Sequence, residues 1–148
     1  MKNSILIALN DSLSSRAVID YICGLSFRPE DVRFTLLHIY REPASGEELM
    51  GKQYMRKLPL KYLTVLSTAK DKLTHAGFLK ENIEVSLVTD PYPTVADGII
   101  DQFKKQPYTM VVVGRKRMSK AEEFVMGDAS VKLVRALEGT AVMVVKLK

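Results

Sequence analysis

The sequence is poor in cysteine and has no long apolar run. Cys23 is the only cysteine among the 148 residues, so the chain cannot form an internal disulfide or a zinc site that needs several cysteines. The longest apolar stretches, residues 5–9 and 141–145, have five residues each, whereas a membrane-spanning helix needs roughly 18 and a signal-peptide core roughly 7–15. These absences exclude the disulfide-rich and membrane classes, and they make the cytoplasm the expected location.

Histidine is almost as scarce as cysteine. The two histidines, His38 and His75, are far apart and have no cysteine or carboxylate at the spacing of a metal site, so we expect structural or surface roles for both. Cys23 lies in an apolar helical segment without an obvious activating cation, which favours a buried apolar role over a nucleophilic one. No serine has a plausible histidine partner either, so the sequence predicts no hydrolytic triad and we expect a protein that is not an enzyme.

What the sequence does contain indicates one domain with a basic surface. The 148 residues, 47% of them hydrophobic, correspond to a single domain over residues 1–148 with enough apolar side chains for a core. Lysine and arginine outnumber aspartate and glutamate by 22 to 17, a net charge of +5. This excess favours contact with phosphates, acidic partners or polynucleotides without selecting among them.

Short β-rich segments alternate with segments of helical periodicity. Continuous apolar runs predict strands covered on both faces, whereas residues 83–87 alternate apolar and polar side chains and suggest a strand near a sheet edge. Thr94, with Asp97 three residues later, predicts a capped helix start, and Pro107 predicts the helix end. The expected strands span residues 4–9, 32–40, 83–87, 109–113 and 140–147, and the expected helices span residues 12–24, 60–77, 94–107 and 127–138. Residues 41–59 are predicted to form a long connection, part of which could be helical.

Strands separated by helices predict right-handed crossovers and a parallel sheet between two helical layers. We therefore expect an α/β fold with a doubly wound, five-stranded parallel sheet and helices on both faces. In such sheets ligands bind beyond the carboxyl ends of the strands, where the strand order reverses. Two connections are suited to ligand binding at this position, namely residues 10–15 after the first strand and residues 114–130 after the fourth. We expect these connections to border one crevice.

Residues 114–127 combine several features of a phosphate site. A glycine stands at each end of this segment, and its first half contains four cations, Arg115, Lys116, Arg117 and Lys120. Backbone N–H groups at a helix start favour anions, as does the helix dipole, and the cations would add to this field. The alternative is a solvated loop whose charges oppose aggregation.

The whole chain resembles the universal stress proteins. Residues 5–11 resemble the first strand of that family and the acidic turn after it, residues 36–40 its second strand, and residues 111–146 its signature region. In ATP-binding members the signature is a glycine, two residues, a glycine, nine residues, and a glycine followed by serine or threonine. Gly114 and Gly127 stand at the first and third glycine positions with the required separation.

Two positions depart from this signature. Arg117 replaces the middle glycine, and Asp128 replaces the serine or threonine. At a helix start, Asp128 could accept hydrogen bonds from the N–H groups of Ser130 or Val131, which a phosphate would otherwise receive, and its charge would repel the phosphate. Arg117 could pair either with Asp128 or with a phosphate, and both alternatives stay open.

Asp11 follows the first strand, where the resemblance implies contact with the adenine or ribose side of a nucleotide. Capping of the next helix, together with Ser12 or Ser14, is the alternative role. The candidate nucleotide-binding residues are therefore Asp11, Gly114, Arg115, Arg117, Gly127, Asp128 and Ser130.

The resemblance implies a non-enzymatic stress-response or signalling module that acts as a homodimer, and the departures at Arg117 and Asp128 predict that ATP binding is weakened or absent. The dimer would pair the last strands, from Ala141 to Val145, across a two-fold axis, because exposed apolar edge strands recruit partners. One alternative is an ATP- or AMP-binding switch of the same family. Another is a polynucleotide-binding protein that uses residues 115–120 and 52–61, which the lack of interleaved aromatic residues and of a recognition motif disfavours.

Overall fold

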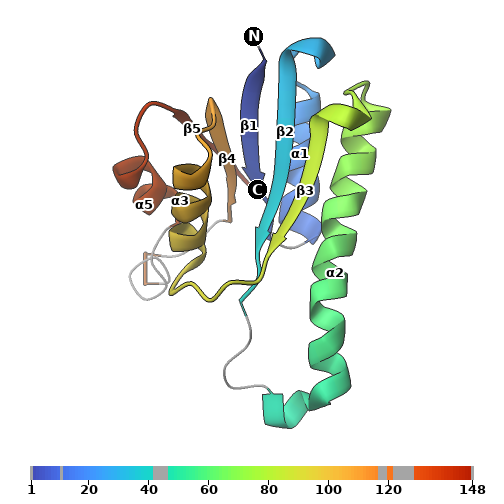
Figure 1. The fold of residues 1–148 in the computed structure, drawn as a ribbon, viewed down its shortest axis with the longest axis vertical. Helices are drawn as coiled ribbons and strands as arrows, with labels where there is room; N and C mark the ends of the chain where they lie inside the picture. Colours follow the sequence, from blue (N-terminus) through green and yellow to red (C-terminus); the bar gives the residue numbers. More distant parts are fainter. Residues whose placement is uncertain (1, 11, 42–46, 117–119, 122–128, 148) are drawn as a thin grey trace.

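The chain folds into a parallel sheet between two layers of helices. The computed structural model describes residues 2–10, 12–41, 47–116, 120–121 and 129–147. The sheet has five parallel strands in the order β3-β2-β1-β4-β5 (Figure 1). These strands are β1 (Asn3–Ala8), β2 (Val32–Ile39), β3 (Ile83–Val88), β4 (Met110–Arg115) and β5 (Ala141–Lys146). From β1 the chain proceeds to one edge and then returns to build the other, so the predicted doubly wound α/β fold is confirmed.

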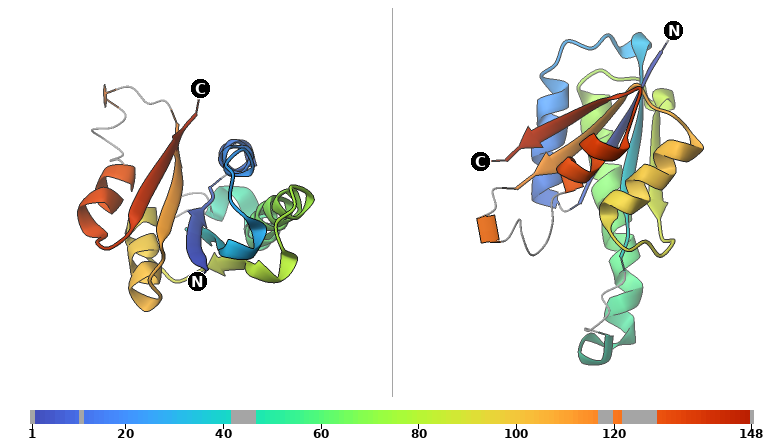
Figure 2. Two further views of the ribbon diagram at one scale, coloured as in Figure 1. Left: turned by 90° about the horizontal axis from the view of Figure 1, so that it is seen from above. Right: turned by 90° about the vertical axis from the view of Figure 1, so that its left-hand side faces the viewer.

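Helices cover both faces of the sheet, α1 and α2 on one face and α3 and α5 on the other (Figure 2). Their bounds are α1 (Ser12–Cys23), α2 (Glu47–His75), α3 (Val95–Lys105) and α5 (Ala129–Ala136), and short 3-10 turns, Pro29–Asp31 and Lys80–Asn82, precede β2 and β3. The central strand β1 is buried on both sides, with Ile5 and Ile7 in the core under α1 and α2 and with Leu6 and Ala8 in the core under α3 and α5. Among the described helices, none combines the length and the apolarity needed to cross a lipid bilayer.

Helix α2 begins much earlier than the sequence predicted. A connection was expected over residues 41–59, but α2 begins at Glu47 and continues through Pro59. A proline removes one backbone hydrogen bond and normally ends or kinks a helix. Tertiary contacts on both sides of this proline hold the helix, because Leu58 is buried and the ring of Tyr62 stacks on a side chain of β2. The first turns of α2 thereby extend past the carboxyl ends of the strands (Figure 1).

The remaining described elements agree with their predicted bounds to within one or two residues. The alternating strand, β3, lies at one edge of the sheet as predicted, and β5 lies at the other. The predicted cap of α3 is also confirmed, since Thr94 Oγ1 accepts a 3.1 Å hydrogen bond from the N–H of Asp97. Local sequence therefore predicted where these elements begin and end.

Candidate functional site

The connections after β1 and β4 leave the sheet side by side. These two strands pair in parallel with Ala8 opposite Val113, so Leu9 and Asn10 continue next to Gly114. The two strands are therefore neighbours, which is the condition on which the predicted shared crevice depends. Their carboxyl ends mark the point where the strand order reverses, which is the usual ligand position in a doubly wound sheet. Four of the predicted site residues lie outside the described residues, namely Asp11, Arg117, Gly127 and Asp128.

Gly114 has a structural function that involves no ligand. Helix α1 packs closely on β4 at this point, and a Cβ atom added to Gly114 would lie 3.0 Å from Cγ2 of Val18. Val18 is buried, and its branched side chain has little rotational freedom. Glycine therefore permits the close approach of α1 to β4, and its presence here is not by itself evidence for a phosphate site.

Positive charge gathers at the carboxyl end of β4. Arg115 is half-buried opposite Lys146 of β5, and its carbonyl accepts a 2.9 Å hydrogen bond from the N–H of Leu147. Lys116 follows it and is exposed, as is Lys120. The sheet thus carries the start of the basic segment to the switch point, where its charge could attract an anion.

The start of α5 is tied to the start of α3 by an ion pair that sequence reasoning missed. Ser130 is buried in the first turn of α5. Lys132 Nζ lies 2.7 Å from Asp97 Oδ1 and 3.3 Å from Thr94 Oγ1. The hydrogen bond from Lys132 lowers the pKa of the Asp97 carboxyl, which favours the ionised carboxylate. The positive charge of Lys132 is therefore already compensated within the fold, and no local motif reveals a pairing between such distant segments.

His38 is a buried polar residue near the carboxyl end of β2. Its Nδ1 lies 2.7 Å from the carbonyl oxygen of Leu9, and because a carbonyl can only accept, Nδ1 is the protonated nitrogen. The ring stacks on Tyr62 of α2, with the ring centroids 4.0 Å apart. Burial lowers the pKa of this imidazole, which favours the neutral ring. These contacts hold the chain where it leaves β1, in agreement with the structural role expected for His38.

Cys23 and His75 complete the set of candidate reactive side chains. Burial, and to a lesser extent the nearby Asp20, raises the pKa of the half-buried Cys23 thiol, which opposes formation of the nucleophilic thiolate. His75 Nδ1 is 2.7 Å from the carbonyl oxygen of Asp71, one turn earlier in α2. Within the described residues, no three histidine, cysteine, aspartate or glutamate side chains group together as a metal site would require.

This protein is of the class of doubly wound α/β proteins that have a candidate anion site at the carboxyl ends of the strands. Its fold, the switch point at β1 and the basic segment after β4 define this class. A sequence profile of the Universal stress protein family matches residues 1–146, and the chain belongs to this family.

Several solved structures have the same fold. The hypothetical protein MJ0577 is 17% identical, with a TM-score of 0.74 and coverage of 100% of this chain and 98% of that chain. A universal stress protein in complex with cAMP is 17% identical, with a TM-score of 0.67 and coverage of 99% and 98%. The universal stress protein of Archaeoglobus fulgidus in complex with dAMP is 16% identical, with a TM-score of 0.64 and coverage of 97% and 98%. No curated protein sequence matches the chain significantly.

Proposed function

We propose that this chain is a cytoplasmic, single-domain stress-response or signalling module that is not an enzyme, acts as a homodimer, and binds nucleotide weakly or not at all. The observation that carries the nucleotide part of the proposal is the steric requirement for Gly114. Because Val18 packs against this glycine, close packing favours glycine at one of the two retained signature positions whether or not a phosphate binds. The match at Gly114 therefore adds little support for nucleotide binding.

The departures from the signature oppose a bound phosphate. Asp128 would place a carboxylate at the start of the last helix, where ATP-binding members have a hydroxyl side chain. Two like charges about 4 Å apart at an effective dielectric constant of about 20 repel by roughly 4 kcal/mol before screening by salt. Arg117 could offset part of this repulsion by pairing with the carboxylate. Lys132, one turn further on, already pairs with Asp97 and offers little additional charge to a ligand.

The contacts of His38 and the raised pKa of the Cys23 thiol support a binding module and not an enzyme. His38 is held by Leu9 and Tyr62, and the Cys23 thiol is biased towards its protonated form. A general base needs a pKa near the working pH and access to a substrate, and His38 is buried with its pKa lowered.

The outer edge of β5, with which no strand of the described residues pairs, supports a homodimer. β5 is the last strand of the sheet, and its segment from Ala141 to Val145 contains no charged side chain. A strand of this kind offers unpaired backbone groups to a second copy, and a two-fold axis would pair it with itself in antiparallel fashion.

Equilibrium dialysis against ATP and Mg²⁺ tests the nucleotide part of the proposal. We expect no saturable binding at millimolar ATP. Saturable binding of ATP by the wild-type protein in the micromolar range would show that Asp128 and Arg117 are compatible with a bound phosphate, and would reject this part.

A nucleotide-binding switch is the second candidate. Two proteins of the same fold have solved structures in complex with cAMP and with dAMP, both of which carry one phosphate instead of three. A ligand with one phosphate would meet less repulsion from Asp128 than ATP does. Dialysis against cAMP and AMP therefore separates the two candidates, because saturable binding of either ligand favours the switch.

A further inference from the structure

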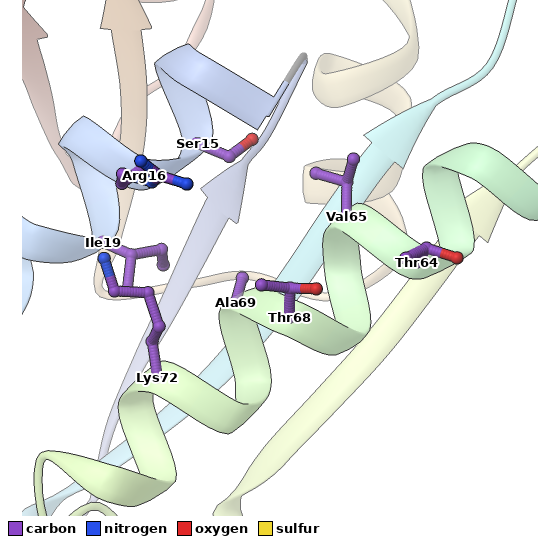
Figure 3. A pocket seen from close by; sticks show the side chains of 8 residues that line it. All are labelled: Ser15, Arg16, Ile19, Thr64, Val65, Thr68, Ala69 and Lys72. Carbon is purple, nitrogen blue, oxygen red and sulfur yellow. The ribbon is translucent and has the colours of Figure 1, made fainter.

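A pocket of about 160 Å³ lies between α1 and α2, on the side of the molecule formed by these helices (Figure 3). The residues that matter for its chemistry are Ser15, Arg16 and Ile19 of α1 and Val65, Ala69 and Lys72 of α2. None of them is among the residues predicted to bind nucleotide. Ser15 is the one lining residue that belongs to a connection expected to border the crevice, and the other lining residues lie further along α1 and on α2, so the pocket has a chemistry of its own.

The inner wall of the pocket is aliphatic. Ile19 and Ala69 are core residues with 0% and 4% of their surface exposed, and Val65 is half-buried beside them. The short side chain of Ala69 leaves space between the two helices. A cavity of about 150 Å³ accommodates a benzene ring, so this pocket has room for one six-membered ring.

Ser15 contributes an unsatisfied polar group to the pocket. This residue is 4% exposed, and its Oγ forms no hydrogen bond with any part of the chain that the structure describes. The side chain projects from α1 towards the space beside α2 (Figure 3). By contrast, Thr64 at the rim satisfies its hydroxyl by donating to the carbonyl of Leu60. Buried hydroxyl groups are normally paired, so Ser15 points to a missing polar partner.

Positive charge stands at the mouth of the pocket. Arg16 is exposed, and its guanidinium forms no ion pair with the described residues. Lys72 also lines the pocket and pairs with Asp20. Two cations and one carboxylate leave a net positive charge, and a guanidinium presents paired N–H donors that match a carboxylate.

We propose that this pocket binds a small aromatic carboxylic acid that carries a second polar substituent. The carboxylate faces Arg16 and Lys72, the ring contacts the aliphatic wall, and the substituent forms a hydrogen bond with Ser15 Oγ. The inference does not depend on whether the protein binds nucleotide.

The test uses the full-length ¹⁵N-labelled protein and three probes, 4-hydroxybenzoate, benzoate and 4-hydroxybenzyl alcohol. Amide chemical shifts of α1 and α2 are followed as each probe is added. We expect saturable shifts with 4-hydroxybenzoate, weaker binding of benzoate, which lacks the hydroxyl, and weaker binding of the alcohol, which lacks the charge. Arg16→Gln should raise the dissociation constant of 4-hydroxybenzoate about tenfold, because a charge-assisted hydrogen bond is lost. Arg135→Gln, an exposed change on α5, is the matched control and should leave the affinity unchanged.

Ser15→Ala should change protein stability and ligand preference in different ways. Removal of an unpaired buried hydroxyl should raise the melting temperature of the ligand-free protein, while 4-hydroxybenzoate should then bind no better than benzoate. The proposal is overturned if no probe gives saturable shifts on α1 and α2, if Arg16→Gln binds as well as Arg135→Gln, or if Ser15→Ala leaves the preference for 4-hydroxybenzoate intact.

Discussion

Replacement of Val144 by proline tests the homodimer at the open edge of β5. The N–H of Ala141 donates to Thr109 O at 3.2 Å and that of Leu147 to Arg115 O at 2.9 Å, so both point towards β4. Backbone groups alternate in direction along a strand, and the N–H groups of Val142 and Val144 therefore point to the open edge. A proline at position 144 removes a donor from this edge and leaves the pairing with β4 intact.

The size of the effect follows from this alternation. In an antiparallel pair centred on Met143, Val142 of each copy lies opposite Val144 of the other, and the two residues exchange two hydrogen bonds. The dimer then contains four such bonds, and Val144→Pro in both copies removes two of them. At about 1 kcal/mol net per bond, the dimer loses about 2 kcal/mol, which is roughly a thirtyfold increase in the dissociation constant.

Sedimentation equilibrium measures this constant, and Val144→Ala is the matched control. The side chain of Val144 packs into the core below α3 and α5, so both variants lose that packing, but only proline loses the N–H. For the same reason a lysine at position 142 or 144 would disturb the core as well as the edge. Circular dichroism should show that the proline variant folds, since proline is tolerated where the N–H faces an open edge. Equal dissociation constants for the two variants, or a wild-type protein that is monomeric at every concentration, would refute the edge-to-edge dimer.

Three further predictions concern the core, the buried histidine and the signature departures. Gly98→Ala would place Cβ 2.8–3.0 Å from three carbons of the buried Ile39. The overpacking cost of about 1–3 kcal/mol should exceed the helix-propensity gain of about 1 kcal/mol, so the variant should be less stable than the wild type. A urea melt that shows stabilisation contradicts this. The lowered pKa of His38 means that this residue binds more protons in the unfolded state. The contribution of His38 to the free energy of unfolding should therefore be constant above about pH 6.5 and fall below it, and His38→Asn should reduce that slope in melting curves recorded across pH. Arg117→Gly combined with Asp128→Ser should create or strengthen ATP binding in equilibrium dialysis, and unchanged binding would show that neither departure affects the phosphate.

The sequence alone determined the order and type of most elements. Continuous apolar runs mark strands that helices cover on both faces, as in β1, and the alternation of residues 83–87 marks β3 as an edge strand. The cap formed by Thr94 and Asp97 was equally readable. These features were predictable because each depends on side chains that are close together in the chain, where propensity and periodicity act directly.

Tertiary structure decided the features that depend on contacts between distant segments. Helix α2 continues through Pro59 because Leu58 and Tyr62 pack on either side of it, although proline alone predicts a break. The signature spacing predicts that Gly114 contacts a ligand, but this glycine also makes room for Val18 of α1. Such contacts arise only after sheet order and register bring the segments together, so no local pattern in the sequence reveals them.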